Sequence, residues 1–219
     1  MNTITTYKFS DLPTQELKDA AIEHHRYDNT SFEDWHDPTL DDWKEKLEAL
    51  GYSDPEIQYS GFWSQGDGAS FTSKQVPLPS TDPKVIEAWD QLIGAAELLG
   101  QPVTEDINDM AYGSVIRTGH HYFHENTVSV DWEWNDPPYT DRWEYFADPT
   151  PEGIQPFITT LKDAVESYFD GLEEIVKDLC KEIYSDLEKE YDYQTSDEAV
   201  EQAIEDMEFE VDEEGDLVS

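Results

Sequence analysis

The longest regular pattern of apolar positions runs from residue 154 to residue 191. Apolar residues recur there at alternating steps of three and four, which predicts an amphipathic helix of about three heptads. The stripe consists of Ile158, Leu161, Val165, Tyr168, Leu172, Ile175 and Leu179, flanked by Ala164, Phe169, Val176, Cys180 and Tyr184. So wide a stripe favours a helix packed on the core of its own chain. A narrower seam within it leaves open a homodimer through Leu161, Tyr168, Leu172 and Leu179.

Four shorter segments also have helical spacing of apolar residues, between signals that begin and end helices. Three of them start at a side chain that can accept a hydrogen bond from the first turn, and glycine follows two of them. We expect helices over residues 10–27 (N-cap Ser10), 38–51 (N-cap Thr39, ending at Gly51), 82–100 (N-cap Asp82, Pro83 next, ending at Gly100) and 195–207.

The remaining periodic segments have the composition of strands and predict hairpins. Asp67 and Gly68 form a turn pair in the first hairpin. In the second hairpin, the alternation places Val128, Val130, Trp132 and Trp134 on one face. The expected strands cover residues 3–9, 56–63, 69–76, both halves of 110–135, 137–146 and a hairpin-like tail over 208–218.

Together these elements predict an α+β fold: a mostly antiparallel sheet of hairpins packed with helices, and one long C-terminal amphipathic helix. The chain of 219 residues is expected to form a single domain over residues 1–219. Residues 192–219 are strongly acidic, and we expect them to form a semi-independent appendage to that domain.

The net charge of the chain disfavours some classes of binding partner. The chain has 52 acidic and 13 basic residues, a net charge of -39. Direct binding to nucleic acid or to an anionic membrane is disfavoured, since both require positive charge. A basic protein partner is favoured instead. Adaptation to high salt is the less favoured explanation, because ten of the basic residues are lysine and three are arginine. No signal peptide or membrane-spanning run is evident, so a cytoplasmic location is expected.

The glycine-rich stretch at residues 57–71, "IQYSGFWSQGDGASF", raises the question of a phosphate-binding loop. A P-loop needs Lys and then Ser or Thr after its last glycine, and a helix after that. Here Ala69 follows Gly68 and a strand is expected, so nucleotide binding is excluded and no cofactor is expected. The stretch predicts a tight hairpin whose Tyr59, Phe62 and Trp63 form an aromatic patch able to anchor a partner.

Two motifs carry a resemblance to a known family. These are "YSGFWSQGDGASF" at residues 59–71 and the acidic run "YDYQTSDEAVEQAIEDMEFEVDEEGDL" at residues 191–217. With them, the chain from about residue 40 onward resembles a family of uncharacterised acidic bacteriophage and prophage proteins, some of them labelled antitoxin-like. The resemblance implies a phage-encoded accessory protein acting in the cytoplasm of a bacterial host. It supplies no catalytic residues.

Candidate catalytic chemistry is sparse. His120 and His124 could share a metal with a carboxylate such as Glu125 or Asp131, but the remaining residues of a zinc-protease motif are missing. The favoured interpretation is polar residues at a hairpin tip. The single cysteine, Cys180, excludes an internal disulfide, and a thiol on an apolar stripe is usually inert. We therefore predict no catalytic residue, no bound metal and no enzymatic activity, with a metal-dependent enzyme as the less favoured alternative.

Acidic residues also populate the outer positions of the long helix and the short helix after it. Carboxylates three or four residues apart on a helix are about 5–6 Å apart along one face, a spacing that can imitate a phosphate track. The predicted partner-binding residues are Asp163, Glu166, Asp170, Glu173, Glu174, Asp178, Glu182, Asp186, Glu188, Glu190, Glu201 and Glu205. The sequence thus favours a DNA mimic that inhibits a host nucleic-acid-binding or defence protein. The alternatives are an antitoxin-like protein that neutralises a basic toxin, and a merely solvated surface.

Overall fold

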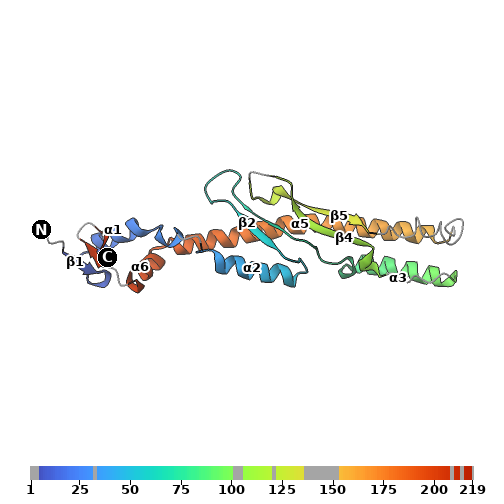
Figure 1. The fold of residues 1–219 in the computed structure, drawn as a ribbon, viewed down its shortest axis with the longest axis horizontal. Helices are drawn as coiled ribbons and strands as arrows, with labels where there is room; N and C mark the ends of the chain where they lie inside the picture. The colour runs from blue at the N-terminus through green and yellow to red at the C-terminus, as the bar shows by residue number, and fades with distance from the viewer. Residues whose placement is uncertain are drawn as a thin grey trace. The chain divides into compact units, whose positions relative to one another are not determined.

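The computed structural model describes residues 5–31, 34–100, 106–119, 122–135, 153–207, 210–212 and 215–218 (Figure 1). Its helices and short antiparallel sheets confirm the predicted α+β class, including the long C-terminal helix. The chain divides into two compact units. Unit 1 comprises residues 1–41 and 185–219, and unit 2 comprises residues 42–184.

Unit 1 is built from strands β1 (Thr6–Lys8), β6 (Glu210–Asp212) and β7 (Leu217–Val218) with helices α1 (Gln15–His25) and α6 (Asp197–Asp206). The strands form one antiparallel sheet in the order β1-β6-β7, which confirms the predicted tail hairpin. The small core contains Phe9, Leu12, Ala21, Ile22, Val200, Ile204 and Val211.

The predicted start of the first helix was wrong. Thr14, not Ser10, caps α1, since its side chain accepts a hydrogen bond from the backbone of Leu17. Proline disfavours helical backbone in the residue before it. Accordingly Leu12, which precedes Pro13, has an extended conformation that separates α1 from the short turn Phe9–Asp11.

Unit 2 contains the two predicted hairpins. Strands β2 (Glu56–Tyr59) and β3 (Ala69–Thr72) form the first, and β4 (Ala111–Arg117) and β5 (Val128–Trp134) form the second. Both are antiparallel. Ser73 and Val115 exchange two backbone hydrogen bonds of 3.0 and 3.1 Å, which join the hairpins edge to edge. The strand predicted over residues 137–146 lies outside the described residues.

The described part of unit 2 also contains three α-helices. They are α2 (Asp37–Ala49), which begins in unit 1, α3 (Pro83–Leu98) and α5 (Gln155–Gln194), whose last residues belong to unit 1. Asp82 caps α3 as predicted, and Gly51 adopts a positive φ of 97° just after α2. However, α2 begins two residues before the predicted cap Thr39, because Pro38 is compatible with the first turn of a helix.

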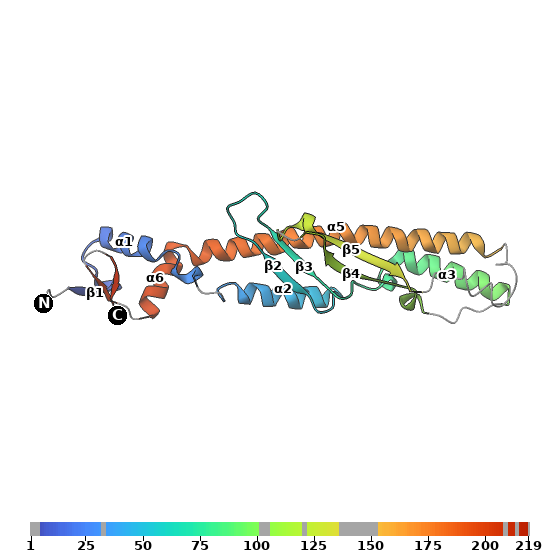
Figure 2. The same ribbon diagram turned by 45° about the horizontal axis from the view of Figure 1, so that its top comes forward.

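Helix α5 packs along the β4–β5 hairpin, and α3 lies beside the N-terminal half of α5 (Figures 1 and 2). The rings of Trp132 and Phe169 are parallel, with centroids 4.6 Å apart. Phe169 is only 1% exposed. The Tyr168 hydroxyl donates a 2.6 Å hydrogen bond to the carbonyl of Pro77. This contact fixes α5 against the segment that follows β3.

The register predicted for the long helix was partly wrong. Ile175, placed on the apolar stripe, is 52% exposed. An α-helix has 3.6 residues per turn, so a heptad stripe drifts by about 20° per heptad on a straight helix. The buried residues of α5 are Ile158, Leu161, Val165, Phe169, Leu172, Val176, Leu179, Cys180, Ile183 and Leu187. The proposed seam residues Leu161, Leu172 and Leu179 are therefore part of the protomer's own core.

At Gly113, β4 lies close to a side chain of α5. A Cβ atom there would lie 2.9 Å from Cε1 of Phe169 and 3.1 Å from Cγ2 of Val76. We expect Gly113→Ala to lower the free energy of unfolding by about 1–3 kcal/mol through overpacking. The matched control is Gly171→Ala, because Gly171 lies in α5 and a Cβ atom added there would have no atom within 4 Å beyond the neighbouring backbone of its own helix. That control should raise stability by about 0.5–1 kcal/mol. Urea denaturation measures both, and two effects of the same sign would contradict the packing.

Candidate functional site

The predicted acidic residues are divided between the two units. Those in unit 2 are on α5: Asp163, Glu166, Asp170, Glu174, Asp178 and Glu182 are exposed, and Glu173 is half-buried. In unit 1, α5 carries the exposed Glu188 and the half-buried Asp186 and Glu190, and α6 carries Glu201 (half-buried) and Glu205 (exposed). The larger continuous set is therefore the one on α5 in unit 2.

Within that set, the helix arranges five carboxylates in a regular row. Glu166, Asp170, Glu174, Asp178 and Glu182 occur at every fourth residue of α5. Each step rises about 6 Å and turns by about 40° in the right-handed sense, so successive carboxyl groups are about 7 Å apart. The same spacing continues in the sequence through Asp186 and Glu190. The row was not recognised from the sequence, although the four-residue spacing was visible there.

Lysines neutralise one end of this carboxylate row more than the other. Lys177 contacts Glu173 and Glu174 at 2.9 and 3.1 Å, and Lys181 contacts Asp178 at 2.8 Å. Hydrogen bonds to these carboxylates raise the pKa of both lysines. Lys46 of α2 contacts Glu182 at 3.2 Å.

No such neutralisation is found toward the N-terminal end of α5. Among the residues that the structure describes, Asp163, Glu166 and Asp170 form no ion pair. These three carboxylates are exposed, so their charge faces solvent and is available to a cationic partner.

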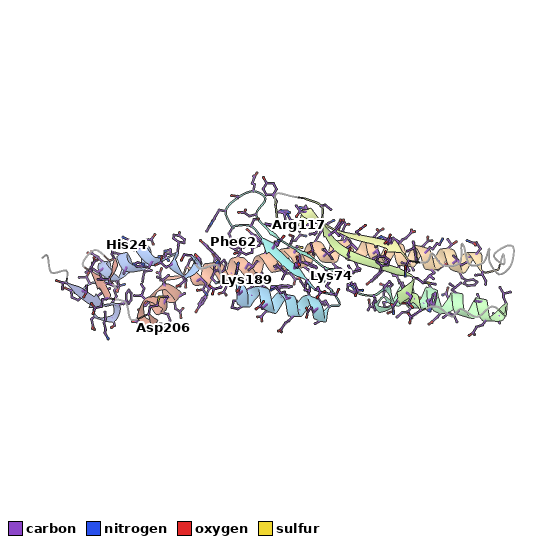
Figure 3. The ribbon with its side chains drawn as sticks, viewed as in Figure 1. His24, Phe62, Lys74, Arg117, Lys189 and Asp206 are labelled. Atoms are coloured by element: carbon purple, nitrogen blue, oxygen red, sulfur yellow. The ribbon has the colours of Figure 1, made fainter. Side chains whose placement is uncertain are left out.

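The predicted aromatic patch is divided between packing and exposure. Phe62, labelled in Figure 3, lies in the loop between β2 and β3. Its ring stacks on those of Tyr59 and of Tyr184 in α5, with ring centroids 5.9 and 5.6 Å away. Trp63 is 77% exposed. Both were predicted to lie in a strand, but β2 ends at Tyr59 because the Asp67 carboxylate accepts hydrogen bonds from the backbone of Trp63 and Ser64 and folds the loop. Of the three residues of the predicted patch, Trp63 alone is largely exposed.

Of the two histidines considered as metal ligands, one lies in a described turn. His124 caps the short turn Glu125–Thr127, where its Nδ1 accepts a hydrogen bond from the backbone of Asn126. His120 lies outside the described residues. Over the described ranges, no group of three or more His, Cys, Asp or Glu side chains is placed to hold a metal ion. The less favoured alternative, a metal site at His120 and His124, is therefore not tested by the described residues.

Cys180 is fully buried on α5, and burial raises the pKa of its thiol to about 12. Since the thiolate is the reactive form, we expect almost no alkylation of the folded protein at pH 8. Labelling with iodoacetamide, followed by mass spectrometry, should show complete reaction only in denaturant. Because the pKa is raised, reactivity of the folded protein should remain low until the pH approaches 12. Rapid labelling of the native protein at pH 8 would contradict the burial.

Residues 35–197 match the model of a domain of unknown function, DUF8835. The chain belongs to this family. The DUF8835 match includes all of unit 2 and all of α5, and thus the carboxylate row and the aromatic loop. Searches of curated proteins and of solved structures each gave no match. Among the described helices, none has the length and apolar character needed to cross a membrane.

Proposed function

We propose that this protein binds a basic, nucleic-acid-binding protein, and that α5 in unit 2 presents carboxylates where the partner's groove normally takes phosphates. The carboxylate row Glu166, Asp170, Glu174, Asp178 and Glu182 carries the proposal, because its spacing of about 7 Å is close to that of phosphates along one DNA strand. The resemblance to phage proteins favours a host defence or nucleic-acid enzyme as the partner. Occupation of its groove would inhibit that enzyme.

The spacing also sets the expected strength of binding. Along the helix axis, the row supplies one charge per about 6 Å, whereas one strand of B-DNA supplies one per about 3.4 Å. The partner should therefore bind this protein with a weaker salt dependence than it binds DNA. Asp163, Glu166 and Asp170 form no ion pair among the described residues, so they should contribute most because they need not give up a lysine first.

The test is capture from a bacterial lysate on the immobilised full-length chain, at low and at high salt, with duplex DNA as competitor. We expect retention of a nucleic-acid-binding protein at low salt and its displacement by DNA. Retention of no basic protein at low salt would overturn the proposal. Retention that DNA does not affect would also overturn mimicry.

One observation favours a second candidate, the antitoxin-like protein. The exposed Trp63 lies at the surface of a loop shaped by the Tyr59, Phe62 and Tyr184 stack, and exposed tryptophan is a frequent anchor of protein interfaces. An apolar anchor should make binding resistant to salt. Capture of one small basic protein that survives high salt and is lost in Trp63→Ala would support this candidate over mimicry.

A further inference from the structure

A hollow of about 270 Å³ lies between β5 and α5 in unit 2. It has an apolar part and an acidic part. The residues that line it are Val130, Trp132, Phe169, Asp170, Glu173 and Glu174. The volume is below the range of pockets for drug-sized ligands, about 300–1,000 Å³, and suits a single side chain.

The apolar part of the hollow is packed against the core of unit 2. Trp132 is held parallel to the buried ring of Phe169, with an angle of 4° between the ring planes. Gly113, directly opposite Trp132 in the hairpin, lets β4 approach Phe169 closely. The shape of this floor is therefore set by core packing, so a ligand would not have to order it.

The acidic part carries a net negative charge. Glu173 and Glu174 share the ammonium group of Lys177, at 2.9 and 3.1 Å. Asp170 forms no ion pair among the described residues. These four groups together carry a charge of about -2, and the unpaired one belongs to the carboxylate row. A cation entering the hollow thus meets one carboxylate with no competing lysine.

We infer that this hollow receives an arginine side chain of the basic partner, an inference that rests on the proposed function. A guanidinium group is flat and weakly hydrated, and it can stack on an aromatic ring while it forms two parallel hydrogen bonds to a carboxylate. Trp132 and Asp170 supply this pair of groups on facing elements. A lysine ammonium is strongly hydrated and gains less from an aromatic floor. Arginine is therefore preferred to lysine at this site, while the rest of the row attracts both alike.

The test compares nona-arginine and nona-lysine peptides, which have equal charge, by calorimetry at about 0.15 M salt with the full-length chain. We expect the arginine peptide to bind about tenfold more tightly. Asp170→Asn should reduce this preference to about twofold. The matched control is Asp163→Asn, which removes another exposed carboxylate of the same helix that does not line the hollow and forms no ion pair among the described residues. It should weaken both peptides slightly and leave the tenfold preference unchanged.

A second readout follows the floor of the hollow directly. The indole N–H signal of Trp132, assigned in NMR spectra with Trp132→Phe, should shift on addition of the arginine peptide and shift little with the lysine peptide. Equal binding of the two peptides by the unmodified chain, or equal effects of Asp170→Asn and Asp163→Asn, would overturn the inference. These outcomes are separate from those of the lysate capture. Retention of a DNA-binding protein without an arginine preference would contradict only arginine binding at the hollow. An arginine preference without a retained protein would contradict only the imitation of DNA.

Discussion

Phe169→Ala is expected to lower the free energy of unfolding of unit 2 by about 3–5 kcal/mol. Phe169 is 1% exposed, stacks on Trp132 and lies within contact distance of Gly113. Its removal leaves a cavity where α5 meets the β4–β5 hairpin. The glycine backbone cannot fill that space, and neighbouring side chains are held by the hairpin register. The effect should therefore be near the upper part of the range for aromatic truncations.

Urea denaturation followed by tryptophan fluorescence measures this effect. Six of the seven tryptophans belong to residues 42–184, so the signal reports mainly on unit 2. The matched control is Ile175→Ala, a truncation on the same helix at a residue that is 52% exposed. It should change stability by no more than about 0.5 kcal/mol. Comparable losses of stability in the two variants would contradict the register of α5 in the structure and support the heptad register predicted from the sequence.

That register illustrates how far the sequence predicts the fold. Local signals were sufficient where one residue decides the backbone: Asp82 caps α3, and Gly51 follows α2 with a positive φ. They were insufficient along α5. Phe169 was assigned to the flank of the stripe and Ile175 to the stripe itself, whereas the structure buries the first and exposes the second. Which face of a long helix is buried depends on the strands it packs against, and α5 meets several of them in turn.

The candidate site shows the same limit. The acidic character of α5 and its exposed positions could be predicted, because charged residues on an amphipathic helix face solvent. The hollow could not, since Val130 and Trp132 come from β5 and meet Asp170 only through hairpin-to-helix packing. The sequence likewise could not predict which residues of the aromatic patch are packed and which are exposed. It depends on Asp67 folding the loop and on Tyr184 of α5 lying under Phe62.

Neutralising the carboxylate row should produce the largest effect on binding. The variant replaces Glu166, Glu174 and Glu182 by Gln, and Asp170 and Asp178 by Asn. At low salt, each exposed carboxylate is expected to contribute roughly 0.5 kcal/mol to the attraction of a cationic groove, so five losses weaken binding of the DNA-displaceable partner by about 70-fold. The helix should remain folded. The ion pairs lost at Lys181 and Lys46 are exposed, the half-buried Lys177 keeps its partner Glu173, and repulsion along the row is relieved.

The control must remove the same charge from elsewhere in unit 2. Five exposed carboxylates on α2 and α3 serve this purpose: Asp42, Glu45, Glu48, Glu87 and Asp90. Both variants have the same net charge, and they differ only in where five charges are lost. If position matters, the control keeps most of its affinity while the row variant loses it, with affinities measured by calorimetry on the purified partner.

Equal losses in the two variants would mean that the partner responds to total charge alone, and α5 would then have no special role. Single substitutions refine the result. Mimicry by a row predicts small, graded losses from each carboxylate, whereas an enzyme that depends on one carboxylate loses its activity in a single step. Substitution of Asp170 is expected to cost more affinity than substitution of its neighbours in the row, because Asp170 also lines the aromatic hollow.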